Sequence, residues 1–323
     1  MQTIIHHATL SREMIKALAA LITSLLLLNC SHAVSHEQSP KAQTPAPDNL
    51  RGQIEKISVD AQGRVGASVL LLETVEAVSF NGDQKFPMQS VYKFPIGMAV
   101  LNQVDNGKLK LDQKVRVEKS DLVPAKVYSS IRDKYPQGGV ELSVRELLRY
   151  MIVESDGTAC DVLLRVVGGA ERVNDYLKGL GVTGVVVATT EKEMAQGGDV
   201  QYRNWATPDA ALGLLRAFYE GRGLSAASRA LLLQLMTDVV TGPHRIKGQL
   251  PAGTVVAHKT GTSNTVDGLT RATNDIGIIT LPDGRHLIVA IFVSDSKAAE
   301  DVREGVIARI ARAAYDWATR AVH

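Results

Sequence analysis

The hydrophobic and polar positions divide the chain into strands near both ends and helices in between. Short apolar or alternating runs bounded by turn residues favour strands, whereas apolar residues recurring every three or four positions favour helices. The pattern predicts strands at residues 66–73, 74–80, 254–258, 275–281 and 286–293. It predicts helices at residues 50–57, 94–104, 143–153, 158–167, 170–180, 208–220, 225–239 and 298–318.

The order of these elements predicts the architecture. The chain leaves a sheet, builds a group of helices and returns to the sheet, where a Pro-Asp-Gly turn at residues 282–284 joins the last two strands. A sheet made of hairpins is antiparallel, and the terminal helices should pack on it. We therefore expect an α/β fold of the α+β kind. Its sheet lobe should comprise about residues 48–89 and 241–323, and its helical lobe about residues 90–240.

The N-terminal segment has the layout of an export signal. Residues 18–28 are almost entirely apolar, but the run is too short to span the hydrocarbon core of a bilayer comfortably. Lys16 precedes the run, and Ser31 and Ala33 supply the small residues that signal peptidase prefers. The sequence predicts a signal peptide at residues 1–33 that is cleaved after Ala33.

A second export route is open at the same segment. Cys30 can serve as a lipid-anchored N-terminus, although Asn29 is a poor residue before such a cysteine. In either case residues 34–47, which contain three prolines, are expected to form a flexible tether. The chain should have no membrane span.

Composition narrows the classes of function. The 323 residues are 45% hydrophobic and 22% charged, which is typical of a folded globular protein. The net charge is +2 and no basic stripe stands out, so nucleic acid is not an expected partner. Two cysteines exclude a disulfide scaffold, and no His-Glu-x-x-His or Cys-x-x-Cys spacing supports a metal. We expect no metal and no cofactor.

The candidate nucleophile is a serine at the start of a buried helix. Ser90 precedes Lys93 by three residues, which places the two side chains one helical turn apart on the same face. A serine hydroxyl needs a base within hydrogen-bond reach, and free N–H groups at a helix start can hold an oxyanion. A second Ser-x-x-Lys, at Ser294 and Lys297, begins at a strand end and is expected to be structural.

Two further motifs follow in a recognisable order. Ser155-Asp156-Gly157 lies among the helices and Lys259-Thr260-Gly261 on a strand after them. Taken singly, Ser155 could be a helix cap and Lys259 an exposed strand charge. Together with Ser90 they follow the order of S-x-x-K, S-D-N and K-T-G in class A β-lactamases and penicillin-binding proteins.

From about residue 50 to the C-terminus the chain resembles the class A serine β-lactamases, and most of all their extended-spectrum subgroup with an altered active-site loop. Further matching runs are residues 190–194, 201–205, 258–263 and 272–275. The resemblance implies the serine β-lactamase/DD-peptidase-like fold. It implies export to the bacterial periplasm or medium and a small-molecule β-lactam as the partner. A monomer is expected.

The resemblance also implies catalytic roles. Ser90 would attack the lactam carbonyl, and the N–H groups of Ser90 and Thr262 would hold the oxyanion. Lys93, with Glu191 acting through a water, would take the Ser90 proton. Ser155 would relay a proton to the departing lactam nitrogen.

Substrate binding is assigned by the same resemblance. Lys259 and Thr260 would bind the substrate carboxylate, helped by an arginine, which here is expected to be Arg245 because the more usual strand position carries Asn274. Arg271 is a rival for that role. The predicted substrate-binding set is completed by Tyr128, which would stack beside the substrate ring, and by Gly157, Gly261 and Ser263.

Two positions depart from the family pattern. Gly157 stands where most members have asparagine, so an amide that would bind the substrate side chain is missing, at a cost of about 1 kcal/mol. Ala195 occupies the place of a second asparagine that helps Glu191 to hold the hydrolytic water. The geometry of the loop that carries Glu191 and Ala195 is therefore expected to differ from the family pattern.

Three functions compete at this stage. The first is hydrolysis of β-lactams through a serine acyl-enzyme, followed by Glu-assisted deacylation. The second is a D-alanyl-D-alanine peptidase or penicillin-binding protein on the same fold, and the third is a non-catalytic penicillin-binding domain. Glu191, in the long loop at residues 185–206, favours the first because deacylation needs a general base. Glu193 is a less favoured candidate for the same role.

Overall fold

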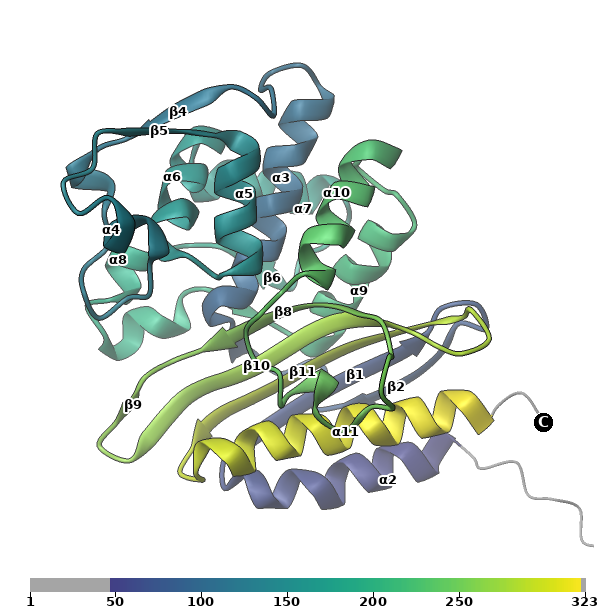
Figure 1. Ribbon diagram of the computed structural model, residues 1–323. Coiled ribbons are helices and arrows are strands. Elements are labelled where there is room, and N and C mark those ends of the chain that lie inside the picture. The colour runs from purple at the N-terminus through teal and green to yellow at the C-terminus, as the bar shows by residue number, and fades with distance from the viewer. Residues whose placement is uncertain (1–46, 321–323) are drawn as a thin grey trace, which may run out of the picture. The chain divides into compact units, whose positions relative to one another are not determined.

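The two ends of the described chain, residues 47–320, form one antiparallel sheet in this computed structural model (Figure 1). The strand order is β2-β1-β11-β10-β8, and short β9 pairs with β10. All pairings are antiparallel, as the hairpin pattern predicted. The strands are β1 (Arg64–Leu71), β2 (Glu76–Phe80), β8 (Val256–Thr262), β9 (Thr265–Val266), β10 (Leu269–Thr280) and β11 (His286–Ser296).

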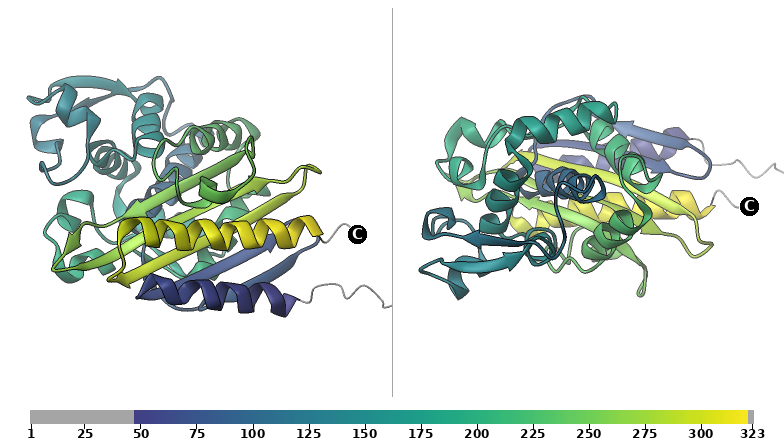
Figure 2. Two further views of the ribbon diagram at one scale, coloured as in Figure 1. Left: turned by 60° about the horizontal axis from the view of Figure 1, so that its bottom comes forward. Right: turned by 90° about the horizontal axis from the view of Figure 1, so that it is seen from above.

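Helices cover both faces of this sheet (Figure 2). Helices α2 (Pro47–Ser58) and α11 (Glu300–Arg320) lie side by side on one face, and the remaining helices lie on the other. Each face of the sheet packs on its own hydrophobic core, and strand β11 contributes to both. Its successive side chains point to opposite faces. Leu287, Val289, Ile291 and Val293 pack toward α2 and α11, whereas Ile288, Ala290 and Phe292 pack toward the other helices.

The helices of the second layer surround α3 (Lys93–Asp105), whose first nine residues are all buried. Two caps explain where neighbouring helices begin. The predicted capping box of Ser143 and Glu146 starts α5, and the Asp156 carboxylate accepts the Ala159 N–H at 2.8 Å at the start of α6. The helices are α4 (Ser130–Lys134), α5 (Val144–Val153), α6 (Gly157–Val167), α7 (Gly169–Gly179), α8 (Glu191–Met194), α9 (Pro208–Tyr219) and α10 (Ala226–Thr237).

Short elements connect the two layers. The 3-10 turns are η1 (Val59–Ala61), η2 (Gln89–Tyr92), η3 (Lys119–Asp121), η4 (Gly198–Tyr202) and η5 (Ile246–Gln249). The short strands are β3 (Phe86–Pro87), β4 (Lys114–Val117), β5 (Val140–Ser143), β6 (Val185–Val186) and β7 (Trp205–Ala206). None of these strands was predicted, because segments of two to four residues carry too few positions for periodicity.

The predicted helices are confirmed to within a few residues, but two strand predictions were wrong in extent. Strand β10 begins six residues before the predicted 275, and β8 runs four residues past the predicted 258. Polar residues are buried in both extensions, so hydrophobicity did not reveal them; Thr273, Asn274, Lys259 and Thr260 are at most 3% exposed. As expected, Ser294 of the second Ser-x-x-Lys is structural, since it is buried in β11 and donates to Asp295.

The predicted signal peptide and all but the last residue of the predicted tether lie outside the described residues. Residue 47, placed in the tether, begins α2. Among residues 47–320 no helix is long and apolar enough to cross a membrane.

Candidate active site

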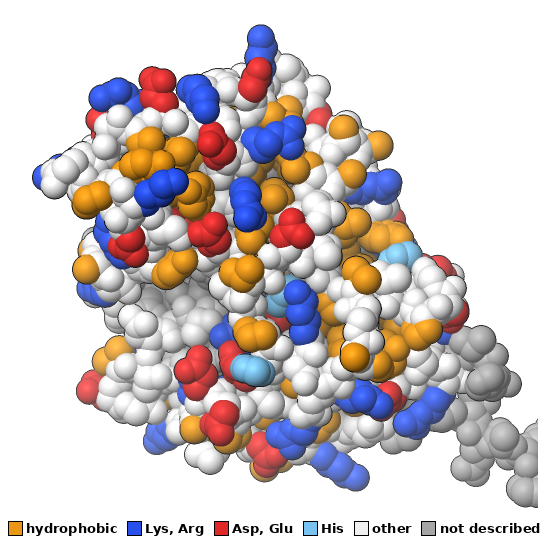
Figure 3. Space-filling model, in the orientation of Figure 1, with side chains coloured by type: hydrophobic (Ala, Val, Ile, Leu, Met, Phe, Trp, Pro, Cys, Tyr) orange, Lys and Arg blue, Asp and Glu red, His pale blue; other side chains and the backbone are white. Residues whose placement is uncertain are grey.

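A pocket of about 500 Å³ opens where β8 faces the helical layer. The space-filling view shows the surface hollowed between the sheet and the helices on the side of β9 and α8 (Figure 3). Eight of the predicted site residues line it: Ser90, Lys93, Tyr128, Ser155, Glu191, Thr260, Thr262 and Ser263. The fold thus brings residues from five separated parts of the chain to one cavity.

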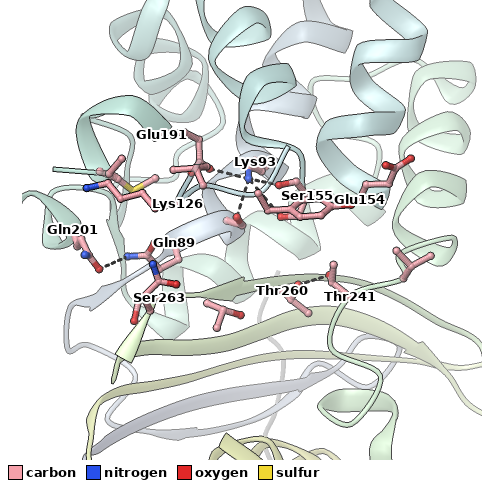
Figure 4. A pocket seen from close by; sticks show the side chains of 18 residues that line it. Gln89, Lys93, Lys126, Glu154, Ser155, Glu191, Gln201, Thr241, Thr260 and Ser263 are labelled. Atoms are coloured by element: carbon pink, nitrogen blue, oxygen red, sulfur yellow. Dashed lines mark hydrogen bonds and ion pairs between the residues drawn. The ribbon is translucent and has the colours of Figure 1, made fainter. Parts of the chain in front are cut away.

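Lys93 is the centre of the hydrogen-bond network (Figure 4). Ser90 lies in turn η2, and Lys93 is the first residue of α3. The Lys93 Nζ lies 2.8 Å from Ser90 Oγ, 2.7 Å from the Ser155 carbonyl oxygen and 2.8 Å from Glu191 Oε1. One amine therefore contacts the candidate nucleophile and the candidate general base at once.

The charge state of Lys93 follows from two opposing effects. Burial lowers the pKa of Lys93, whose side chain is 1% exposed, but the adjacent Glu191 carboxylate more than compensates and the net pKa is raised. Lys93 is therefore an ammonium in the resting site. The group with free lone pairs to accept a proton is Glu191, which is itself buried.

Lys259 behaves in the opposite way. It is completely buried and lacks a carboxylate partner among the described residues, so burial together with the Lys93 charge pushes its pKa well below the usual range. Its Nζ donates to Ser155 Oγ at 2.9 Å, and the Lys93 Nζ lies 3.4 Å from the same hydroxyl. Ser155 thus lies between two lysines that both reach its hydroxyl. This arrangement suits a hydroxyl that passes a proton on.

Gly261 lets strand β8 approach the nucleophile. A Cβ at this position would lie 2.2 Å from the Met88 carbonyl oxygen and 3.2 Å from the Ser90 nitrogen, so only glycine fits. Buried Asn274, on β10, donates to the Pro87 and Met88 carbonyls at 2.8 and 3.1 Å and so holds the same turn. Gln89 adopts a φ of +46° there, the kind of backbone strain that collects at functional sites.

Glu191 is held by the backbone around it. It is the first residue of the short helix α8, and the half-buried Asp161 carboxylate accepts the N–H groups of Glu191 and Lys192 at 2.7 and 3.1 Å. The Asn204 side chain accepts from Ala188 and Thr189 and so closes the loop on itself. Burial raises the pKa of Asp161 to about 7.

Glu193 does not compete for the role of Glu191. Its carboxylate accepts the Thr190 N–H at 2.8 Å, completing a capping box with the Thr190 side chain at the start of α8. It is exposed and lies outside the pocket that holds Ser90. The preference for Glu191 agrees with this geometry. Ala195 lines the pocket one turn after Glu191, and its N–H donates to the Glu191 carbonyl.

The expectation that Arg245 helps to bind the substrate carboxylate stays a prediction. Its guanidinium is 3% exposed and lies behind β8, where it pairs with Glu304 at 2.9 Å and donates to the Gly261 and Asn274 carbonyls. Only one N–H points toward the pocket wall, at 2.7 Å from Thr262 Oγ1. Arg245 is thus placed to orient Thr262 and to add positive charge beside the pocket. Arg271 is absent from the pocket lining.

The remaining substrate-binding candidates lie on the pocket rim or behind it. Tyr128 is 59% exposed and lines the pocket, and Ser263 lines it while its hydroxyl accepts the Ala272 N–H. Gly157 is buried behind the lining. A Cβ there would lie 2.6 Å from Val127 Cγ1, so the usual asparagine would not fit without movement of Val127.

Sequence reasoning missed several residues that the structure places at the site. Asp161 and Glu154 carry no motif of their own, and Thr241, whose hydroxyl lies 2.5 Å from that of Thr260, comes from a connecting segment. No local signal marks these residues, because their positions follow from packing of distant segments. Among the described residues no group of three His, Cys, Asp or Glu side chains comes together to hold a metal.

Fold and site together define a serine hydrolase that works through an acyl-enzyme. Residues 49–318 match the β-lactamase enzyme family, and the chain belongs to that family. The predicted class A resemblance is confirmed. The activity is hydrolysis of the β-lactam amide bond.

Named relatives make the subgroup explicit. The chain is 42% identical over 298 residues to extended-spectrum β-lactamase PER-1 of Pseudomonas aeruginosa, covering 92% of this chain and 94% of that protein. It is 38% identical to β-lactamase VEB-1 of the same organism, covering 84% and 90%. A crystal structure of a β-lactamase from Chitinophaga pinensis superposes with a TM-score of 0.81 at 49% identity, covering 83% of this chain and 98% of that one.

Replacing Gly261 by alanine tests the close approach of β8 to the nucleophile. The added Cβ must push the strand away from Met88 and Ser90, which spoils the paired N–H groups that an oxyanion needs. We expect kcat/KM for nitrocefin to fall by about 10²–10³-fold. Gly305→Ala, in helix α11 where no atom lies within 4 Å of the added Cβ, is the control and should retain parental turnover. Parental turnover in Gly261→Ala would contradict the assignment.

Replacing Asp161 by asparagine tests the raised pKa of this carboxyl. Between about pH 4 and 7 the folded protein keeps the Asp161 proton and the unfolded chain has lost it, so stability falls as the pH rises through this window. The amide of the substituted asparagine cannot titrate. The parent's free energy of unfolding, measured in urea, should therefore decline relative to that of the variant by up to about 4 kcal/mol across the window.

Exposed Asp199, in the same loop, supplies the control for this experiment. Asp199→Asn should follow the parental pH profile. Identical pH profiles for the parent and Asp161→Asn would refute the assignment.

Proposed function

We propose that Ser90 is the nucleophile of β-lactam hydrolysis and that Lys93 and Glu191 act as one proton-accepting unit. The observation that carries this is the pair of 2.8 Å contacts from the Lys93 Nζ, one to Ser90 Oγ and one to Glu191 Oε1. As Ser90 attacks, Lys93 receives its proton and gives another to Glu191. Because the two proton transfers are coupled, Lys93 keeps the same number of protons and the Ser90 proton is in effect moved to Glu191.

Attack creates an oxyanion on the lactam carbonyl. Two backbone N–H groups, of Ser90 and Thr262, are the proposed donors, supported by the fit of Gly261 against the nucleophile turn. When the C–N bond of the lactam breaks, the nitrogen takes the Ser155 hydroxyl proton. Ser155 is replenished from Lys93, whose Nζ lies 3.4 Å from its oxygen, while the Lys259 Nζ donates to the same oxygen at 2.9 Å.

The positively charged residues on one side of the pocket orient the substrate through its carboxylate. The substrate carboxylate is proposed to bind the hydroxyls of Thr260 and Thr241, in the field of Lys259 and of Arg245 behind the strand. Tyr128 then flanks the ring at the rim. Gly157 and Ser263 shape the walls.

Deacylation distinguishes the hydrolase from a D-alanyl-D-alanine peptidase that stalls with penicillin. Hydrolysis of the Ser90 ester needs a base beside the ester, and Glu191 is a buried carboxylate that lines the same pocket. Before this step the proton on Glu191 returns to Lys93, which has given one to Ser155, so Glu191 is a carboxylate again. Glu191 then takes a proton from the attacking water, and a proton passes through Lys93 to the departing oxygen, which leaves as the Ser90 hydroxyl. Because PER-1 is an extended-spectrum β-lactamase, oxyimino cephalosporins are suitable substrates to assay.

We propose export of the protein to the bacterial periplasm as a monomer, with cleavage after Ala33. N-terminal sequencing of periplasmic protein should begin at Val34. Ala33→Arg should block this processing because signal peptidase needs a small residue there, whereas Cys30→Ser should leave it intact. Diacylglycerol on Cys30, with processing that stops in Cys30→Ser, would establish the lipid-anchored alternative.

Replacing Glu191 by alanine separates acylation from deacylation. Without the carboxylate, the contact that most raises the Lys93 pKa is gone, so more of the amine is neutral and able to accept the Ser90 proton. Acylation should persist as a nitrocefin burst, while steady turnover falls by about 10²–10⁴-fold. Mass spectrometry should find the adduct on the Ser90 peptide.

Glu193→Ala is the matched control in the same helical turn. It removes a capping interaction but no pocket group, and should turn over nitrocefin at close to the parental rate. Near-parental steady turnover in Glu191→Ala, or an adduct on another serine, would overturn the proposed roles.

A further inference from the structure

One carboxylate in the pocket has no part in the proposed mechanism. Glu154 immediately precedes Ser155 and lines the same pocket. It forms no ion pair with any residue of the described chain, whereas the other pocket carboxylate, Glu191, is paired with Lys93. An unpaired negative charge at the mouth of a binding site acts on whatever ligand passes it.

Hydrogen bonds hold this carboxylate in place. The Ser130 hydroxyl donates to Glu154 Oε2 at 2.6 Å, and the Tyr128 hydroxyl lies 2.8 Å from the same Ser130 oxygen. Since Ser130 gives its only proton to Glu154, Tyr128 donates to Ser130. The string runs from the exposed ring on the pocket rim to the carboxylate, and it fixes the position of the carboxylate oxygen.

The charged groups of the pocket are separated along its length. Figure 4 shows Glu154 beside Ser155 at the end near Thr241, whereas Lys126 lies toward the opposite end with Gln201. Lys126 therefore does not neutralise Glu154. The two lysines that contact Ser155 form no ion pair with Glu154 either. Lys93 pairs with Glu191, and Lys259 donates hydrogen bonds to Ser155 and to the Thr260 carbonyl.

The chemistry of a cephalosporin decides which part of the substrate meets Glu154. The ring carboxylate is on the carbon next to the lactam nitrogen, and the C3 substituent is on the neighbouring ring carbon. In the proposed pose the ring carboxylate lies at Thr260 and Thr241 and the lactam nitrogen lies at Ser155. The C3 substituent must then point toward the Thr241 end of the pocket. The C7 side chain, attached beside the lactam carbonyl on the other side, extends toward Gln201.

We propose that Glu154 is a specificity-determining residue that favours cephalosporins with a cationic C3 substituent. The inference rests on the proposed binding of the substrate carboxylate at Thr260 and Thr241. A fixed carboxylate attracts a cation at that end, and it does nothing for a neutral group in the same place. The preference should appear in kcat/KM and weaken with salt, because the pocket mouth is open to solvent.

Cephaloridine and cephalothin form a suitable substrate pair. They share the thienylacetamido side chain at C7 and differ at C3, where cephaloridine carries a pyridinium and cephalothin a neutral acetoxy group. The measured quantity is the ratio of their kcat/KM values. The two substrates' intrinsic reactivities cancel when this ratio is compared between parent and variant.

Glu154→Gln keeps the acceptor for Ser130 and removes the charge. At low ionic strength the ratio should fall about threefold to tenfold relative to the parent, and the difference should shrink below about twofold in 0.5 M salt. Glu154→Lys should lower the ratio further. The thermal unfolding midpoint of each variant shows whether it is folded. If one of the two Glu154 variants folds poorly, the other still tests the proposal.

Glu141→Gln controls for net charge, because it removes one exposed carboxylate on β5 outside the pocket. It should leave the ratio unchanged. A parental ratio in both Glu154 variants would overturn the proposal, as would a fall that persists undiminished in high salt. Failure of the proposed nucleophile would appear separately, as turnover retained by Ser90→Ala.

Discussion

The buried ion pair between Lys93 and Glu191 is the interaction on which the rest of the site depends. Bringing two charges out of water costs several kcal/mol for each ion, and the cost is recovered only when the geometry is close and the remaining hydrogen bonds are satisfied. Here the ammonium has three oxygen partners, from Ser90, Ser155 and Glu191, within 2.8 Å. The pair keeps a proton acceptor next to the nucleophile in a site that excludes most solvent.

The two layers of the fold supply opposite walls of the site around that ion pair. The helical layer carries Lys93 on α3 and Glu191 on α8, while the sheet brings β8 against the nucleophile turn. Because the sheet is covered on both faces, β8 and β10 bury polar residues such as Asn274 without exposing their backbone. A rigid strand edge is a better place for oxyanion donors than a mobile loop, since the donors need no rearrangement during the reaction.

The loop that carries Glu191 is stabilised by buried polar contacts. Asp161 and Asn204 satisfy its backbone N–H groups, and Glu193 caps the helix from outside. Burial of the Asp161 carboxyl raises its pKa, so ionising this group in the folded protein lowers the stability. Asp161 accepts the Glu191 N–H directly, so the contacts that stabilise the loop also fix the position of the proposed general base.

The sequence by itself determined the class of fold, most helix positions and the motif residues Ser90, Lys93, Ser155 and Lys259. These could be predicted because hydrophobic periodicity and short motifs are local, and because several motifs in one order identify a family. The short strands, the polar extension of β10 and the setting of Asp161 and Glu154 were decided only by the tertiary structure. Arg245 shows the reason: its contacts with Glu304 and with the carbonyl of Asn274 fix the position of its guanidinium, and no local pattern reveals them. Contacts between distant segments leave no local pattern, and they decide which buried charges are paired.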